Sequence, residues 1–135
     1  MVKITATYTG EKHCQSVHES SGTKLETDAP KDNQGRGESF SPTDLVATAL
    51  GTCILTTIAI VAERDGINVV GSRMSVEKEM SPPPRKIASL KTIIELPASI
   101  STDYRHKLET IANTCPVKRS LHPDVHVPVE FRYTI

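Results

Sequence analysis

The chain has 135 residues, the usual size of one domain, and we expect residues 1–135 to form a single domain. Its 16 basic residues balance its 16 acidic residues. This balance argues against electrostatic capture of nucleic acid or of an anionic membrane, and favours a small neutral or apolar substrate. Met1 is not followed by the apolar core of a secretory signal, and three cysteines are too few for a secreted disulfide framework. We therefore expect a cytoplasmic protein.

The first forty residues predict a small sheet followed by a loop. Apolar residues alternate with polar ones over Val2–Tyr8, the period of a strand with one buried face. Two further extended segments, Gln15–Ser20 and Thr23–Thr27, flank Ser21-Gly22, which predicts a hairpin. Asp28–Phe40 is rich in Pro, Gly, Asp and Asn without a period, and reads as a loop.

A long apolar helix is predicted over Pro42–Arg64. Ser41 is a good N-cap, Pro42 suits the first helical position, and Asp44 lies in the positively polarised first turn. The length would allow a membrane span, but several threonines and acidic flanks argue against one. The alternative is a central helix of roughly 35 Å, enclosed on most sides. Because a chain of this size can hardly enclose such a helix alone, we expect a dimer.

The second half predicts two strands, a helix and a last strand. Two β-branched runs, Ile67–Met80 and Ile87–Leu96, flank a proline-rich turn and read as a long hairpin. Ser101 is expected to cap an amphipathic helix with one apolar stripe. Val125–Ile135 alternates as a half-buried strand, and Pro128 favours an edge position for it.

The three cysteines differ in their expected environments. Cys115 precedes Pro116, so it is expected at the N-cap of a short helix, where free amides, the helix dipole, Lys118 and Arg119 would lower its pKa. Cys53 lies inside the apolar helix, where a thiol by itself is more often simple core packing. Cys14 reads as a solvated strand residue, and we assign it no role.

The segments Ser41-Pro42-Thr43-Asp44-Leu45, Gly51-Thr52-Cys53 and Cys115-Pro116 resemble the osmotically inducible protein C and organic hydroperoxide resistance (OsmC/Ohr) family. The resemblance covers nearly the whole chain. Its specific part is the pair of cysteines at this spacing, Cys53 eleven residues after the helix-start Pro42 and Cys115 62 residues after Cys53. It implies an OsmC-like α+β fold in which antiparallel sheets pack around a long central helix in an intertwined homodimer.

The resemblance also implies a catalytic role for Cys53 and Cys115. Cys53 would attack a hydroperoxide and become a sulfenic acid, which Cys115 would then capture as a disulfide. A dithiol, dihydrolipoamide in family members, would reduce the disulfide again. Metal, haem and flavin are not needed for this cycle, so we expect no cofactor.

The group that activates Cys53 is not identified by the resemblance. The better-known branches use an arginine held by a glutamate just after the helix-start proline. Thr43 stands at that glutamate position here, and Lys12, Lys31 and Arg36 are the candidate cations, none of which matches cleanly. We assign no cationic partner, and the substrate need not be the organic hydroperoxides of the better-known members.

Two other functions remain open. The first is a metal- or ligand-binding module that uses the two thiols, Cys53 and Cys115, with histidines drawn from His13, His18, His122 and His126. The second is a non-catalytic stress protein that senses oxidation by forming the disulfide slowly. Cys53 and Cys115 lack the short cysteine spacing of a structural zinc site, which argues against the first alternative.

Overall fold

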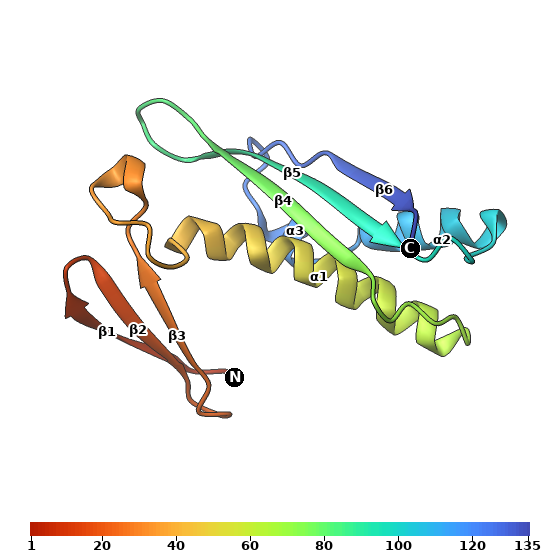
Figure 1. Cartoon of the computed structure of the whole chain (residues 1–135), viewed down its shortest axis with the longest axis horizontal. Helices are drawn as coiled ribbons and strands as arrows, with labels where there is room; N and C mark the ends of the chain where they lie inside the picture. Colours follow the sequence, from red (N-terminus) through yellow and green to blue (C-terminus); the bar gives the residue numbers. More distant parts are fainter. The chain divides into compact units, whose positions relative to one another are not determined.

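The structure is a computed structural model that describes residues 1–135 (Figure 1). The chain divides into two compact units, Met1–Val46 and Ala47–Ile135. Each unit is described by itself below. The long helix α1 (Pro42–Arg64) begins in the first unit and continues through the second.

The first unit contains a three-stranded antiparallel sheet in the order β1-β2-β3 (Figure 1). Its strands are β1 (Ile4–Gly10), β2 (His13–His18) and β3 (Lys24–Asp28). The predicted hairpin is confirmed, since β2 and β3 pair around Ser21-Gly22. The strand predicted over Val2–Tyr8 is also present, but its residues are exposed in the single chain, so no face of β1 is buried there.

A returning loop joins β3 to α1. It contains one short 3₁₀ helix, η1 (Lys31–Asn33), and then runs back along β3, where the amide of Asp28 donates to the carbonyl of Phe40. Gly35 is required on this path, because a Cβ at this position would lie 1.6 Å from the carbonyl oxygen of Ala29. The loop therefore has one close backbone crossing that only glycine allows.

The start of α1 has the predicted cap. The amide of Asp44 donates to Ser41 Oγ at 3.1 Å, and the amide of Ser41 donates to Asp44 Oδ2 at 2.9 Å. This reciprocal pair satisfies backbone donors that the first helical turn leaves free. The helix begins at Pro42 and ends at Arg64, as the sequence predicts.

The second unit contains a three-stranded sheet in the order β4-β5-β6. Its elements after α1 are β4 (Arg73–Met80), β5 (Ile87–Leu96), α2 (Thr102–Ala112), α3 (Pro116–Ser120) and β6 (Val129–Tyr133). β4 and β5 form the predicted antiparallel hairpin, and β6 lies at the edge next to β5. β6 pairs parallel to β5, so the expectation of purely antiparallel sheets is wrong for this edge.

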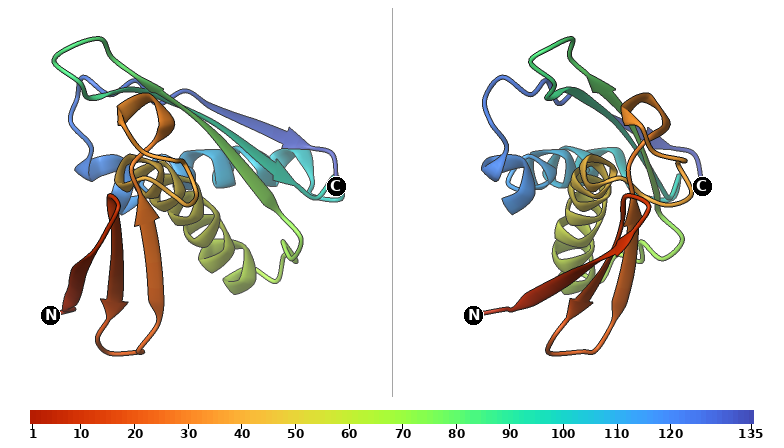
Figure 2. Two further views of the ribbon diagram at one scale, coloured as in Figure 1. Left: turned by 60° about the vertical axis from the view of Figure 1, so that its left-hand side comes forward. Right: turned by 90° about the vertical axis from the view of Figure 1, so that its left-hand side faces the viewer.

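One face of this sheet is covered by helices (Figure 2). Leu90, Thr92, Ile94 and Leu96 of β5 are fully buried, whereas the residues between them are more exposed. Gly51 of α1 packs against β4, because a Cβ there would lie 2.5 Å from Met74 Sδ. The core of this unit therefore lies between α1 and the sheet.

Helix α1 is long and apolar enough to cross a membrane, by length and composition only, a test that core helices also pass. Its most apolar 18-residue window is 39% buried within the single chain. Leu50, Ile54 and Ile58 are buried on one side, while Ile60 on another side is 63% exposed. The single chain thus covers only part of the helix.

The end of α1 is tied to α2 by a polar cluster. Tyr104 Oη donates to Asp65 Oδ2 at 2.8 Å, and Lys107 Nζ forms an ion pair with the same oxygen. These two interactions lower the pKa of Asp65, the hydrogen bond from Lys107 contributing most. The cluster fixes the point at which the chain leaves α1.

Two predicted boundaries differ from the structure. The strand predicted from Ile67 begins only at Arg73, because residues 67–72 form the turn that leads from α1 into the sheet. The strand predicted over Val125–Ile135 is limited to Val129–Tyr133. Before Pro128 only one isolated bridge remains, between His126 and Ser89.

Candidate active site

Cys53 lies in the second unit, in the middle of α1 and half-buried. Cys53 lies about one helical turn after Leu50 and directly before Ile54, and both of these residues are fully buried in the core. Its carbonyl accepts a hydrogen bond from Thr57 Oγ1 at 2.8 Å, one turn further along the helix. The position in a rigid helix fixes where the thiol lies.

Cys115 lies in the same unit, after α2 and at the N-cap of α3. Pro116 is the first helical residue, as predicted. The backbone of Cys115 joins the two helices, because its amide donates to Ala112 and its carbonyl accepts from the amide of Arg119. The side chain is fully buried.

The side chains of Cys53 and Cys115 lie in hydrogen-bond contact, and both are free thiols. Burial raises the pKa of Cys115 most and the hydrogen bond with Cys53 raises it further, so Cys115 keeps its proton to a higher pH than an ordinary thiol. Two sulfur atoms from distant parts of the chain, one half-buried and one fully buried, are thereby brought together.

The expected lowering of the Cys115 pKa is wrong. Burial raises the pKa of this thiol most, and the hydrogen bond with Cys53 raises it further. The amides of Lys118 and Val117 act in the predicted direction but are outweighed, and the side chain forms no cap hydrogen bond. The ammonium group of Lys118 is engaged by Asn113 Oδ1. Desolvation of the thiolate therefore outweighs the short helix.

The third cysteine and the candidate cations all lie in the first unit. Cys14 is half-buried in β2, which is the central strand of its sheet. Arg36 forms ion pairs with Glu11 at 3.0 Å and with Glu38 at 3.5 Å. Lys12 lies in the turn between β1 and β2, and Lys31 lies in η1. Thr43 Oγ1 is 3.2 Å from Ser41 Oγ within the cap of α1.

The histidines do not join the thiols in a ligand cluster. His122 and His126 are exposed on the segment before β6. His18 hydrogen-bonds to Ser21 at the β2–β3 turn. His13 instead gathers with two carboxylates, Asp28 and Glu38, in the first unit. The donor set of the metal-binding alternative, thiols with imidazoles, is therefore not assembled.

A hollow of about 220 Å³ lies beside α1 in the second unit. Its lining comes from α1 and from the turn that follows the helix: Leu55, Thr56, Ile58, Ala59, Val69, Gly71 and Ser72. Neither Cys53 nor Cys115 contributes to it. The thiol chemistry and this hollow are separate features of the unit.

Comparison with known proteins identifies relatives across the whole length. A family model described as OsmC-like protein matches residues 35–130. A solved structure from Psychrobacter arcticus, named for osmotic stress induction and detoxification response, is 37% identical, with a TM-score of 0.93. The match covers 98% of this chain and 96% of that one. Among proteins of curated function, none matches the chain.

More distant solved structures share the fold. The organic hydroperoxide resistance protein OsmC of Legionella pneumophila is 19% identical, with a TM-score of 0.75, over 98% of this chain and 96% of its own. OhrB of Bacillus subtilis, an organic hydroperoxide resistance protein, is 17% identical, with a TM-score of 0.72, over 98% of each chain. The α+β class and the two sheets with a long helix are thus confirmed. Because the family model covers most of the chain and a 37% identical relative covers nearly all of it, the chain belongs to the OsmC-like protein family.

Proposed function

We propose that the protein is a cysteine-based peroxidase that reduces hydroperoxides with Cys53 and Cys115. The observation that carries this proposal is the hydrogen-bond contact between the two thiols. A pair of free thiols in contact, from two separate elements, is the arrangement that a peroxide-reducing disulfide cycle needs. Membership of the OsmC-like family supports the same activity, since two structural relatives are named organic hydroperoxide resistance proteins.

In the first step, the sulfur of Cys53 attacks the terminal oxygen of the hydroperoxide. An S–O bond forms and the O–O bond breaks, so the thiolate becomes a sulfenic acid and the substrate leaves as an alcohol, or as water from hydrogen peroxide. The sulfur loses two electrons to the peroxide. The proton needed by the leaving oxygen is the one that the Cys53 thiol gives up, passed directly or through solvent, so the proton of Cys115 remains for the second step.

In the second step, Cys115 attacks the sulfenic sulfur of Cys53. A disulfide forms and water leaves, carrying the hydroxyl group of the sulfenic acid and the proton of Cys115. An external dithiol then reduces the disulfide by two successive thiol–disulfide exchanges. The dithiol is itself oxidised to a disulfide, and both protein thiols are regenerated. Dihydrolipoamide is the dithiol to test first. All steps are sulfur chemistry and require no metal, haem or flavin.

The environments of the two thiols support this division of roles. Cys115 keeps its proton because burial and the contact with Cys53 raise its pKa. The retained proton of Cys115 is then available for the second step, in which the hydroxyl group of the Cys53 sulfenic acid leaves as water. Cys53 is also the less buried of the two and is therefore the more accessible to substrate.

We also propose that the active form is a cytoplasmic homodimer. Apolar side chains on α1 and on the first sheet are exposed in the single chain, Ile60 to 63% and Ile4 to 65%. A second copy of the chain would cover such surface, and a reducing compartment would keep the thiols ready. Light scattering should give the mass of two chains, and a monomer at working concentration would contradict the assembly.

A stopped-flow experiment tests the peroxidase. Reduced protein is mixed with cumene hydroperoxide or hydrogen peroxide, and thiol loss is followed with and without dihydrolipoamide. The parent should turn over repeatedly with the dithiol, while Cys53→Ser should be slower by at least about 100-fold, because no sulfur remains to attack. Cys14→Ser is the matched control and should react like the parent.

Two outcomes would overturn the proposal. Equal peroxide consumption by Cys53→Ser and the parent would remove Cys53 from the reaction. A single oxidation without turnover, in the presence of several dithiols, would favour a redox sensor over an enzyme.

A further inference from the structure

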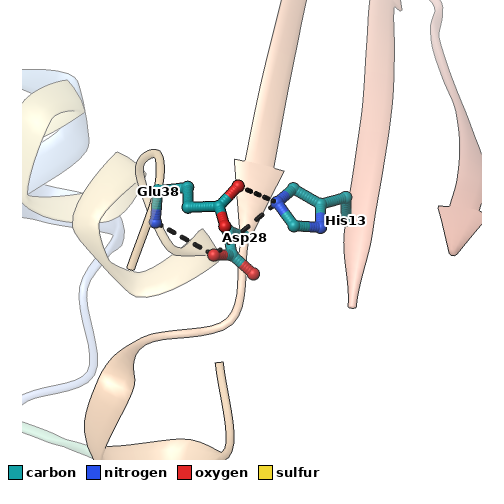
Figure 3. Close-up of side chains that lie close together, drawn as sticks. All are labelled: His13, Asp28 and Glu38. Atoms are coloured by element: carbon teal, nitrogen blue, oxygen red, sulfur yellow. Dashed lines mark hydrogen bonds and ion pairs between the residues drawn. The ribbon is translucent and has the colours of Figure 1, made fainter. Parts of the chain in front are cut away.

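Three potential metal ligands meet at one end of the first sheet, outside the thiol site (Figure 3). His13 is the first residue of β2 and is paired in register with Asp28, the last residue of β3. Glu38 reaches them from the loop that precedes α1. One ligand atom from each side chain lies within 4.8 Å of the other two. The register of the sheet and the return of the loop therefore place an imidazole opposite two carboxylates.

The hydrogen bond on the other side of the His13 ring fixes its tautomer. Nδ1 lies 2.9 Å from the carbonyl oxygen of Glu11, and because a carbonyl only accepts, Nδ1 carries the proton. In the neutral ring, the lone pair of Nε2 then faces the carboxylates of Asp28 and Glu38 (Figure 3). Metal-binding histidines have this arrangement, with the second nitrogen donating to a carbonyl or carboxylate.

The separations around Nε2 match a metal site better than a hydrogen bond. Nε2 lies 3.6 Å from Asp28 Oδ2 and 3.4 Å from Glu38 Oε2. Both exceed the range of about 2.7–3.2 Å for an N–H···O bond. With Zn–N near 2.0 Å and Zn–O near 2.1 Å, two ligands of a tetrahedral zinc ion lie about 3.4 Å apart. The gap between the imidazole and the carboxylates is thus the width that a small cation would span.

Asp28 provides an independent observation. Its side chain is fully buried, and its Oδ1 has no hydrogen-bond partner. Oδ2 accepts from the amide of Glu38 at 3.0 Å. A buried carboxylate with one unsatisfied oxygen is costly unless a cation or a donor compensates it. A cation held close to this carboxylate would offset the cost of burying it.

The nearby charges also balance for a divalent cation. Arg36 forms ion pairs with Glu11 Oε2 and Glu38 Oε1, leaving Glu38 Oε2 directed to His13. The carboxylates of Glu11, Asp28 and Glu38 and the guanidinium group of Arg36 together carry a net charge of −2, which a divalent cation would neutralise. Glu38 is about half exposed, so an ion has a path from solvent.

The backbone holds the histidine in this position at a conformational cost. Glu11 and Lys12 form the turn between β1 and β2, with φ values of 51° and 65°, a region that residues other than glycine rarely adopt. This turn directs the carbonyl of Glu11 to the His13 ring. Strained turns persist where the surrounding structure requires them.

We propose that His13, Asp28 and Glu38 bind one divalent transition-metal ion, with zinc the best match, through His13 Nε2 and one oxygen from each carboxylate. A water molecule would complete a four-coordinate site. The bound ion would tie the β1–β2 turn, the end of β3 and the loop before α1 together. This site contains no thiol, and its existence does not depend on the peroxidase activity.

Zinc binding to a cysteine-free variant tests the proposal, because thiols would otherwise compete for the metal. The variant Cys14→Ser/Cys53→Ser/Cys115→Ser is dialysed against a chelator, then against chelator-free buffer, and titrated with zinc chloride in competition with a chromophoric indicator. We expect one zinc ion per chain. Adding His13→Ala or Glu38→Gln should weaken binding by at least about tenfold. His18→Ala is the matched control, since His18 lies on the same strand but contacts serines.

Cobalt(II) and thermal unfolding provide two further measurements. Cobalt should give the intense visible absorption of a tetrahedral site, and His13→Ala should abolish it. Zinc should raise the melting temperature of the cysteine-free protein but not that of its Glu38→Gln variant. Circular dichroism would confirm that each variant is folded before it is compared.

Three outcomes would overturn the proposal. The first is a cysteine-free protein that binds no zinc at micromolar concentration. The second is equal binding with and without His13 and Glu38. The third is a loss in His18→Ala as large as the loss in His13→Ala, which would place the metal elsewhere.

Discussion

Cys115 and Cys53 are in hydrogen-bond contact, although 62 positions of sequence separate them. The contact joins the middle of α1 to the N-cap of α3. Its effect on chemistry is asymmetric, because it raises the pKa of Cys115 and presents a proton to Cys53. This asymmetry is the basis for the roles that we propose for the two thiols.

One equivalent of hydroperoxide should convert this contact into a disulfide between Cys53 and Cys115. Peptide mass spectrometry under non-reducing conditions would detect the bridge, and Cys14→Ser should form it equally well. In Cys115→Ser the sulfenic acid of Cys53 should persist and be trapped by dimedone, because no thiol is left to capture it. A bridge that contains Cys14 in the parent would contradict the assignment.

Cys115 should react with iodoacetamide only at unusually high pH. Burial and the Cys53 contact raise its pKa, and alkylation requires the thiolate. The pH profile of Cys115 modification, measured by mass spectrometry, should therefore lie above the profile of the same residue in urea. Coinciding profiles would show that the burial seen here does not hold in solution.

The same shift should make stability depend on alkaline pH. The folded state holds the Cys115 proton to a higher pH than the unfolded chain, whose thiol titrates near its ordinary value of 9.0. Above that pH only the unfolded state loses the proton, so the free energy of unfolding falls as the pH rises. Urea titrations from pH 7 to 10.5 should show a smaller fall for Cys115→Ser than for the parent. Tyr104 and Tyr133, whose pKa values are also raised, are common to both proteins and cancel in the comparison.

Asp65→Asn should destabilise the protein at neutral pH. Asp65 accepts from Tyr104 and pairs with Lys107, and these interactions hold its pKa below the ordinary value of 3.8. Since the folded pKa is depressed, this stabilisation is present above pH 3.8 and is lost as the pH falls through the folded pKa. Urea titrations at pH 7 and pH 3 should therefore show a difference between the two proteins that shrinks in acid. Glu63→Gln, at an exposed position in the last turn of α1, is the control and should leave the stability at pH 7 nearly unchanged.

Gly51→Ala should destabilise the second unit although alanine is the better helix former. The added Cβ would lie 2.5 Å from Met74 Sδ, and overpacking of this kind costs about 1–3 kcal/mol. The gain in helix propensity is about 1 kcal/mol, so we expect a net loss of about 1 kcal/mol in chemical denaturation. Shortening the neighbour in Gly51→Ala/Met74→Val should recover much of the loss. A single variant as stable as the parent would mean that Met74 simply moves aside.

Local signals were sufficient for α1 and for the hairpins. Ser41, Pro42 and Asp44 predicted the start of α1 because capping depends on the side chains of the first turn, and the structure has these hydrogen bonds. The start of β4 was misjudged for a different reason. Residues 67–72 have strand composition, but the chain must turn between α1 and the sheet, and these residues form that turn.

Long-range pairing decided features that no local pattern contains. The parallel direction of β6 depends on the path of the chain between β5 and β6, and alternation of apolar residues is the same in either direction. The cluster of His13, Asp28 and Glu38 was also missed. No local sequence pattern marks this cluster. His13 meets Asp28 only because the two residues are paired across β2 and β3, and that pairing requires the exact register of the two strands.

The Cys115 environment shows most clearly where sequence reasoning stops. The position before Pro116 correctly indicated an N-cap, and from that position a lowered pKa was expected. Burial reversed the direction of the shift, because the neighbours that exclude water from the sulfur come from other parts of the chain.

The sequence by itself determined the long helix, the two hairpins and the family to which the chain belongs. These features follow from short-range capping, turn chemistry and periodicity, or from motifs read directly in the chain. Only the tertiary structure decided the direction of β6, the protonated state of Cys115 and the meeting of His13 with two carboxylates. Each of these depends on which distant groups exclude water or face one another, and that is set by packing across the fold.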